Sequence, residues 1–153
     1  MCRKNTYRNY TATWLWLLNF GFTTLVQNRT EKDGSVVSDI QQPLALGGIT
    51  DGITNLEITA AYATIANQGT YTRPVFYSKV VDSNGRILLD NTTPTTHTVL
   101  KSSTASLLTQ GMTSVITEGT GKACALTDGM PVSGKTGTTS SAYDLWFCGY
   151  TPY

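Results

Sequence analysis

The spacing of hydrophobic residues predicts a buried helix in the middle of the chain. Residues 54–66 carry apolar side chains on nearly every side of a helical projection, which is typical of a helix with little exposure to water. Thr54 and Glu57 have the spacing of a capping box, in which each side chain accepts a hydrogen bond from the backbone N–H of the other residue. Glu57 is therefore interpreted as a helix cap rather than an acid–base group. Gly69 is suited to the left-handed residue that ends a helix.

A second helix is predicted to begin near residue 102. Ser102 or Ser103 is suited to cap its N-terminus, and the segment 119–121 (Gly-Thr-Gly) ends it. Its apolar residues recur at helical intervals and form one stripe, made of Leu107, Leu108, Met112, Val115 and Ile116. A stripe of this kind predicts an amphipathic helix.

Between the two helices the pattern changes to that of strands. Residues 71–81 are predicted to form one strand, and residues 86–89 return as a second strand after the Asn-Gly hairpin turn at 82–85. Residues 91–98 form a polar connection that contains the single histidine, His97. A lone histidine in such a segment is interpreted as an exposed loop residue, and no Ser-His-Asp triad can be assembled from it.

The last part of the chain reads as a strand, a short connection and a second strand. Residues 133–139 project a lysine and several hydroxyls, and residues 144–152 carry an aromatic run that favours a strand. Asp144 is expected to serve the turn between the two strands. Cys148 is expected to be a small buried hydrophobic residue, and core positions are predicted for Trp146, Phe147 and Tyr150.

The N-terminal part contains one apolar run, residues 12–26, behind Arg3, Lys4 and Arg8. The run is about 15 residues long and is shorter than the roughly 20 residues that span a bilayer. No small-residue cleavage site follows it, as a secretory signal would require. We therefore expect a buried helix that packs on the domain.

Composition narrows the classes of partner. A length of 153 residues suits one domain, and 40% hydrophobic with 14% charged residues suits a globular chain. The net charge of +1 gives no electrostatic basis for binding nucleic acid, so no nucleic-acid partner is expected. Cys2, Cys124 and Cys148 lack the spacing of a metal site, and neither a metal nor a cofactor is expected.

A nucleotide-binding P-loop is an alternative for the segment around Lys135. Residues 129–136 match its pattern of glycine, four residues, and then Gly-Lys-Thr. A P-loop requires a helix directly after Thr136, because the helix N-terminus and backbone N–H groups bind the phosphates. The strand-like residues that follow disfavour this alternative, and no nucleotide partner is expected.

An ordered set of motifs resembles a known family. The set comprises Leu44 to Thr50 (Leu-Ala-Leu-Gly-Gly-Ile-Thr), Leu56-Glu57, Ala61-Tyr62, Ala66 to Gly69, Tyr71 to Pro74, Lys79 to Asp82, Gly119 to Gly121, Gly134 to Thr139 and Asp144 to Pro152. Residues 20–153 resemble the later part of the transpeptidase domain of class A penicillin-binding proteins, and the final Asp-x-Trp-Phe-x-Gly-Tyr-Thr-Pro run separates them from β-lactamases. Residues 1–19 do not resemble the family.

The resemblance implies an α+β fold, an incomplete β-lactamase/transpeptidase-like fold with an antiparallel sheet flanked by helices. It also implies a penicillin site that includes four residues of the Lys-Thr-Gly strand. Lys135 would supply positive charge near the acyl-transfer centre, and Thr136 a hydroxyl to the substrate carboxylate. Gly137 would let the substrate backbone approach closely. Thr138 occupies the position whose backbone N–H helps to stabilise the oxyanion.

Two further motifs of this family are absent from the sequence. No Ser-x-x-Lys and no Ser-x-Asn occurs in the 153 residues, so the nucleophilic serine is missing. The chain is therefore expected to be a fragment of a peptidoglycan D,D-transpeptidase that is inactive alone. The intact family protein would act on peptidoglycan stem peptides, bind β-lactams and lie at the extracytoplasmic face of the bacterial cell membrane. The alternative is a non-catalytic module that binds a peptide or partner through the edge of the Lys135 strand.

Overall fold

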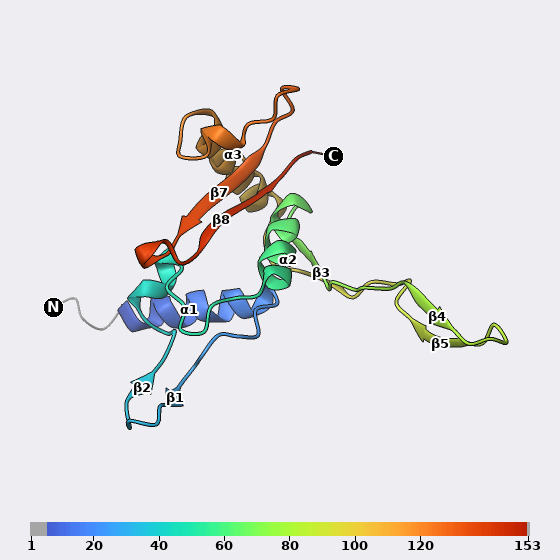
Figure 1. Cartoon of the computed structure of the whole chain (residues 1–153), viewed down its shortest axis with the longest axis horizontal. Coiled ribbons are helices and arrows are strands. Elements are labelled where there is room, and N and C mark those ends of the chain that lie inside the picture. The colour runs from blue at the N-terminus through green and yellow to red at the C-terminus, as the bar shows by residue number, and fades with distance from the viewer. Residues whose placement is uncertain (1–5, 153) are drawn as a thin grey trace. The chain divides into compact units, whose positions relative to one another are not determined.

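The computed structural model describes residues 6–152, and this part of the chain contains three α-helices and four antiparallel strand pairs (Figure 1). The pairs are β1 (Arg29–Thr30) with β2 (Val36–Val37), β3 (Thr70–Thr72) with β6 (Thr96–Thr98), β4 (Lys79–Val81) with β5 (Ile87–Asp90), and β7 (Ser133–Thr138) with β8 (Leu145–Tyr150). The predicted α+β class is confirmed, although the expected sheet consists of separate two-stranded pairs. The chain divides into two compact units, Met1–Ile58 and Thr59–Tyr153.

The first unit contains a helix over the first part of the apolar run 12–26, and residues 20–26 of that run are not helical. This helix, α1 (Thr6–Asn19), packs against a short 3₁₀ helix, η1 (Gln42–Leu46). The prediction of a buried helix is wrong in part, because the side chains of Leu15 and Trp16 are both 51% exposed. Arg3 and Lys4, which precede the apolar run, lie outside the described residues. No helix within residues 6–152 is both long and apolar enough to cross a membrane.

One buried carboxylate organises the loops of this unit. Asp39 is 1% exposed, and its two carboxylate oxygens accept hydrogen bonds from the backbone N–H groups of Val26 (2.7 Å) and Thr50 (2.8 Å). The hydroxyl of Thr50 donates a further hydrogen bond to the same carboxylate at 2.5 Å. A buried carboxylate is costly unless its oxygens accept hydrogen bonds, as they do here. Asp39 therefore joins three loop segments that are far apart in the sequence.

Helix α2 (Asn55–Ala66) begins at the predicted capping box, which is confirmed. Glu57 N–H donates to the Thr54 hydroxyl at 3.2 Å, and Thr54 N–H donates to the Glu57 carboxylate at 2.9 Å. The same carboxylate also accepts hydrogen bonds from the N–H and the hydroxyl of Thr23, both at 2.7 Å. Burial acts to raise the pKa of Glu57, but these hydrogen bonds outweigh it and lower the pKa to about 2. Gly69 takes the expected left-handed conformation, with φ of 89°.

The strands after α2 differ from the prediction. The expected single strand over 71–81 is divided into β3 and β4, and His97 lies in β6 rather than in a loop. His97 pairs across the strands with Tyr71, and their ring centroids are 5.0 Å apart. Such cross-strand pairs stabilise short sheets and explain why the polar segment becomes a strand.

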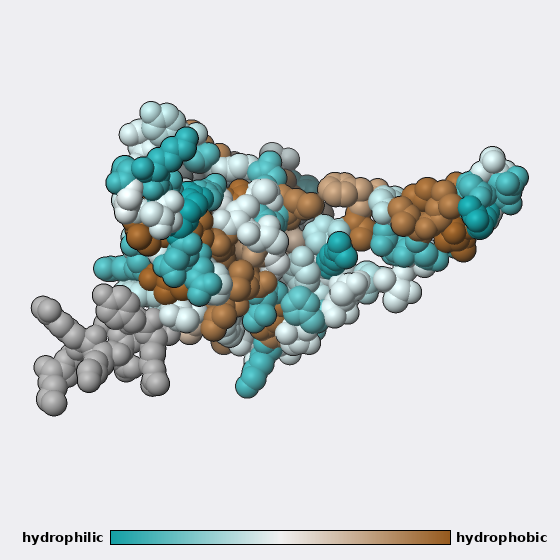
Figure 2. Space-filling view, turned by 90° about the horizontal axis from the view of Figure 1, so that it is seen from below, coloured by the Kyte–Doolittle hydropathy of each residue, from teal (hydrophilic) through white to brown (hydrophobic). Residues whose placement is uncertain are grey.

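The predicted hairpin of β4 and β5 is confirmed, with a bulge between Val80 and Val81. It projects away from α2 and β3 in Figure 1. Figure 2 shows an apolar patch on this arm, and Ile87, Leu88 and Leu89 are each about half exposed. Within the described residues, the hairpin is a sheet of two strands only.

Helix α3 (Ser102–Thr117) is confirmed, its predicted cap is wrong, and its predicted apolar stripe is right in part, since Ile116 is buried and Leu107 and Leu108 are not. The N-cap residue is Lys101, not Ser102 or Ser103, and no side chain caps this end. Leu107 is 68% exposed and Leu108 is 43% exposed, whereas Ala105 and Ile116 are buried. The helix packs on β7 through small and hydroxyl-bearing side chains, which a search for large apolar residues overlooks.

Candidate functional site

The candidate site is built on the antiparallel pair of β7 and β8. Cross-strand partners run from Ser133 with Tyr150 to Thr138 with Leu145. Beyond the strand ends, Thr139 N–H donates to the carbonyl of Asp144 at 3.1 Å, in the same register. Backbone hydrogen-bonding direction alternates along an antiparallel strand. The backbone N–H and C=O groups of Thr136 and Thr138 therefore point away from β8, toward the outer edge of β7.

The connection between the two strands is fixed by Asp144, as predicted. Asp144 N–H donates to the Thr139 hydroxyl at 2.9 Å, and that hydroxyl donates to the Asp144 carboxylate at 3.4 Å. These bonds join the two ends of the turn that contains a short 3₁₀ segment, η3 (Ser140–Ala142). The turn thus aligns β7 and β8 at the end that carries Thr138.

The aromatic ring of Phe147 explains two glycines of this strand pair. A Cβ atom at Gly134 would lie 2.5 Å from Phe147 Cζ and 2.8 Å from the carbonyl oxygen of Cys148. A Cβ atom at Gly149, the cross-strand partner of Gly134, would lie 2.7 Å from the same ring. The ring therefore covers both glycines. The expected core positions are wrong for Trp146 and Phe147, which are 45% and 38% exposed.

Two hydroxyl pairs join α3 to the strands. Thr113 and Ser133 have their hydroxyl oxygens 2.8 Å apart, and Thr109 and Tyr150 have theirs 2.6 Å apart. Ser133 is 7% exposed, so its hydroxyl lies within the packed interface between α3 and β7. These contacts fix the start of β7, just before Lys135.

Lys135 is exposed, and its ammonium group donates a hydrogen bond to the backbone carbonyl of Thr136 at 2.7 Å. This carbonyl is one of the groups that point to the outer edge of β7. The lysine therefore places its positive charge at the edge where an added strand would lie.

The Thr136 hydroxyl has a partner that sequence reasoning missed. Its oxygen lies 2.9 Å from the hydroxyl oxygen of Thr120, in the Gly-Thr-Gly segment after α3. In the sequence, that segment indicates only a helix end and one motif of the family resemblance. The two motifs lie 16 residues apart, and only the packing of α3 on β7 brings them together.

Gly137 and Thr138 complete the set of four predicted residues. A Cβ atom at Gly137 would make only an ordinary contact, 3.7 Å from the Trp146 Cβ atom. The described part of the chain therefore does not itself require glycine at position 137, unlike position 134. Thr138 is exposed at the end of β7. The four residues are consecutive along a strand edge that no other strand among the described residues pairs with.

The backbone geometry of residues 129–138 differs from that of a P-loop. Residues 133–138 form a strand, and the strand continues past Thr136 where a P-loop would begin a helix. The short segment that follows, η3, contains a kink at Ser141. The helix N-terminus that would bind phosphate is therefore not formed there.

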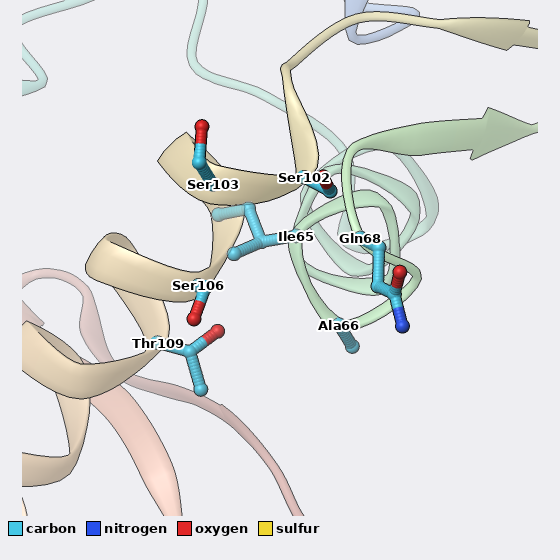
Figure 3. Close-up of a pocket in the computed structure, with 7 residues that line it drawn as sticks. All are labelled: Ile65, Ala66, Gln68, Ser102, Ser103, Ser106 and Thr109. Atoms are coloured by element: carbon cyan, nitrogen blue, oxygen red, sulfur yellow. The ribbon is translucent and has the colours of Figure 1, made fainter.

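A hollow of about 450 Å³ lies between the end of α2 and the start of α3 (Figure 3). Its lining residues are Ile65, Ala66, Gln68, Ser102, Ser103, Ser106 and Thr109. None of the four predicted residues of β7 belongs to this lining. The hollow is therefore separate from the candidate site.

The described residues contain no cluster of three or more side chains that could hold a metal ion. Cys124 and Cys148 are both free thiols that are partly buried. Burial raises the pKa of the Cys148 thiol, which makes it a weaker nucleophile at neutral pH.

The arrangement of β7, β8 and α3 can be compared with known proteins. The family model "Penicillin binding protein transpeptidase domain" matches residues 4–153. The chain belongs to the penicillin-binding protein transpeptidase family. The match begins inside the segment 1–19 that the motif pattern left outside the family region.

Relatives in this family come from several bacteria. Penicillin-binding protein 1A of Aquifex aeolicus is 40% identical over 110 residues, which are 72% of this chain and 15% of that protein. Penicillin-binding protein 4 of Bacillus subtilis is 40% identical over 116 residues, which are 76% of this chain and 18% of that protein. The chain thus spans less than a fifth of the length of these relatives.

Solved penicillin-binding protein structures share the fold. Penicillin-binding protein PonA1 from Mycobacterium tuberculosis has a TM-score of 0.67 at 28% identity, covering 89% of this chain and 37% of that chain. PonA1 in complex with penicillin V gives a TM-score of 0.66 at 28% identity, covering 89% of this chain and 36% of that chain. The D,D-transpeptidase domain of a peptidoglycan glycosyltransferase from Eggerthella lenta has a TM-score of 0.56 at 28% identity. The match covers 69% of this chain and 26% of that chain.

Proposed function

We propose that this chain supplies the substrate-binding strand of a peptidoglycan D,D-transpeptidase. The observation that carries the proposal is the outer edge of β7, where the backbone groups of Thr136 and Thr138 are directed away from β8. An extended peptide can add to such an edge as a further strand. Gly137 leaves room for a close approach of its backbone.

The charge at this edge suits a carboxylate ligand. The Lys135 ammonium group donates a hydrogen bond to the edge carbonyl of Thr136. The Thr136 hydroxyl is paired with that of Thr120 and can still form a further hydrogen bond. The stem peptide of peptidoglycan and a β-lactam both present an extended amide and a carboxylate. In this proposal Lys135 and Thr136 bind the carboxylate, and Thr138 N–H stabilises the oxyanion during acyl transfer.

The reaction itself needs a serine that these 153 residues do not provide in a Ser-x-x-Lys or Ser-x-Asn setting. We therefore propose that the chain alone binds without forming an acyl-enzyme. The whole family protein would perform serine acyl transfer on stem peptides at the extracytoplasmic face of the bacterial cell membrane.

The test separates binding from acylation. Benzylpenicillin is titrated into the isotope-labelled chain, and the amide signals of residues 134–138 are followed by NMR. We expect shifts at these residues, their loss in Lys135→Ala, and no covalent adduct by mass spectrometry. Lys122→Ala is the matched control, since Lys122 lies outside β7. A covalent adduct, or shifts that survive in Lys135→Ala, would contradict the proposal.

A second candidate is a non-catalytic module that binds a peptide or partner through the same strand edge. Two observations favour it equally: within residues 6–152 no strand pairs with the outer edge of β7, and the sequence has no Ser-x-x-Lys or Ser-x-Asn motif. The two candidates differ in selectivity. Binding of an uncharged extended peptide as tightly as benzylpenicillin would favour the module, because it would remove the need for a carboxylate.

A further inference from the structure

The turn that follows α3 makes a contact with β7 that the proposed function does not explain. Thr120 lies in the segment 119–121, and its hydroxyl oxygen is 2.9 Å from that of Thr136. Among the described residues, neither of these two hydroxyls has another hydrogen-bond partner. The pair is therefore an isolated link between the turn and the candidate site.

The two glycines beside Thr120 hold the turn in place. Gly119 N–H donates to the Ser114 carbonyl at 3.0 Å, and Gly121 N–H donates to the Val115 carbonyl at 2.9 Å. A Cβ atom at Gly119 would lie 2.9 Å from the Val115 Cα atom, and one at Gly121 would lie 2.8 Å from Ile116 Cδ1. Both positions are packed against the last turn of α3. The position of Thr120 is therefore set by the helix.

The two hydroxyls together have two protons, and one of them lies between the oxygens. An anionic ligand offers only acceptors, so the hydroxyl that binds it must donate its proton to it. Thr136 can do so only if Thr120 is the donor within the pair. Hydrogen bonds that run in one direction in this way strengthen each other.

We propose that Thr120 is a positioning residue that fixes the Thr136 side chain and directs its O–H toward the outer edge of β7. The ligand at that edge rests on the function proposed above. The orientation of Thr136 does not, since it is a property of the free chain. The Gly-Thr-Gly segment thus has a role in the site beyond ending α3.

The rotamer of Thr136 in the free chain tests the proposal directly. Three-bond couplings from N and C′ to the Thr136 Cγ atom report its χ1 angle by NMR. We expect one rotamer in the wild type, averaged couplings in Thr120→Val, and a single rotamer again in Thr120→Ser, which restores the hydroxyl. Thr117→Val is the matched control, since within residues 6–152 the Thr117 hydroxyl bonds only to the Thr113 carbonyl. Unchanged couplings in Thr120→Val would overturn the proposal.

A fold check and a ligand titration complete the test. Amide signals of β8 must match the wild type in Thr120→Val, and Thr120→Ala serves instead if they do not. Affinity for benzylpenicillin is expected to fall about two- to tenfold in Thr120→Val and to recover in Thr120→Ser, as for loss of one hydrogen bond. If the wild type does not bind benzylpenicillin, the proposed function fails, and the couplings still decide the role of Thr120.

Discussion

The ring of Phe147 occupies the space that a side chain at Gly134 would need, with Phe147 Cζ only 2.5 Å from the position of a Cβ atom. The carbonyl oxygen of Cys148 closes the same space from the backbone side, at 2.8 Å. Gly134 is thus required by the chain's own packing. Gly137, in the same strand, meets only an ordinary contact at 3.7 Å. The two glycines of the Gly-Lys-Thr-Gly run therefore have different causes.

This difference predicts that alanine at position 134 lowers stability, whereas alanine at position 137 lowers ligand affinity. Gly134→Ala should lower the free energy of unfolding by about 1–3 kcal/mol, the usual cost of overpacking. Gly137→Ala should change it by less than about 0.5 kcal/mol, as for a surface site, yet should weaken benzylpenicillin binding. Urea unfolding and the NMR titration measure the two effects. Equal stability losses in both variants would contradict the assignment.

Asp39 should be the most sensitive carboxylate in the first unit. Asp39→Ala removes the acceptor of Val26 N–H, Thr50 N–H and the Thr50 hydroxyl. We expect a loss of about 3 kcal/mol in the free energy of unfolding, because three donors in part-buried hydrogen bonds lose their common acceptor. Asp33→Ala is the control, since in the part of the chain that the structure describes this exposed carboxylate accepts hydrogen bonds from Ser35 alone, and its loss should cost less than about 1 kcal/mol. A similar cost for both would refute the role of burial.

Glu57 predicts how stability depends on pH. Hydrogen bonds from Thr54 and Thr23 outweigh burial and lower the pKa of Glu57 from 4.5 to about 2 in the folded chain. Its contribution to stability is therefore complete above pH 4.5 and is lost as the pH falls through 2. The Tm of the wild type should fall as the pH is lowered from 6 to 2, and in Glu57→Gln this fall should be smaller. An unchanged slope in that variant would show that other carboxylates, such as Asp33 and Asp51, account for it.

The hydroxyl contact between Thr109 and Tyr150 should contribute measurably to the packing of α3 on the strands. A double-mutant cycle with Thr109→Val and Tyr150→Phe should give a coupling energy of about 0.5–1.5 kcal/mol. The matched cycle uses Thr117→Val with Tyr150→Phe, which share no contact, and should give a value near zero. Coupling of equal size in both cycles would indicate a general effect on α3 rather than this contact.

The β4–β5 hairpin should be the least protected of the longer strand pairs. An isolated two-stranded ribbon is marginal in water, and its apolar residues are about half exposed. Backbone amides of β4 and β5 should exchange with deuterium at least about tenfold faster than those of β7, which packs on α3. Hydrogen exchange measured by NMR tests this. Equal protection in the two pairs would mean that the hairpin has a stabilising contact of its own.

Features that depend on local sequence were predictable. The capping box of Thr54 and Glu57, the left-handed Gly69 and the strands on either side of Asp144 all follow from short-range patterns, and the structure confirms them. The family was also predictable, because its motifs occur in order along the chain.

Features that depend on distant partners were not predictable. His97 becomes a strand residue because it pairs with Tyr71, and Thr120 reaches the site only through the packing of α3. The apolar stripe of α3 predicts the burial of Ile116 correctly but not the exposure of Leu107, because hydroxyl-bearing residues such as Thr113 also contact β7. The burial of Asp39 had no signal in the sequence, since an isolated aspartate in a polar segment usually lies on the surface.

The alternation of backbone direction in the β7–β8 pair has a consequence for β8 as well. Its outer edge carries six residues without a single charge, and Leu145 is 71% exposed. An uncharged edge of this kind is a template for a strand from any neighbouring molecule. Self-association of the chain is therefore expected to use this strand, and Leu145→Lys should raise the concentration at which it begins.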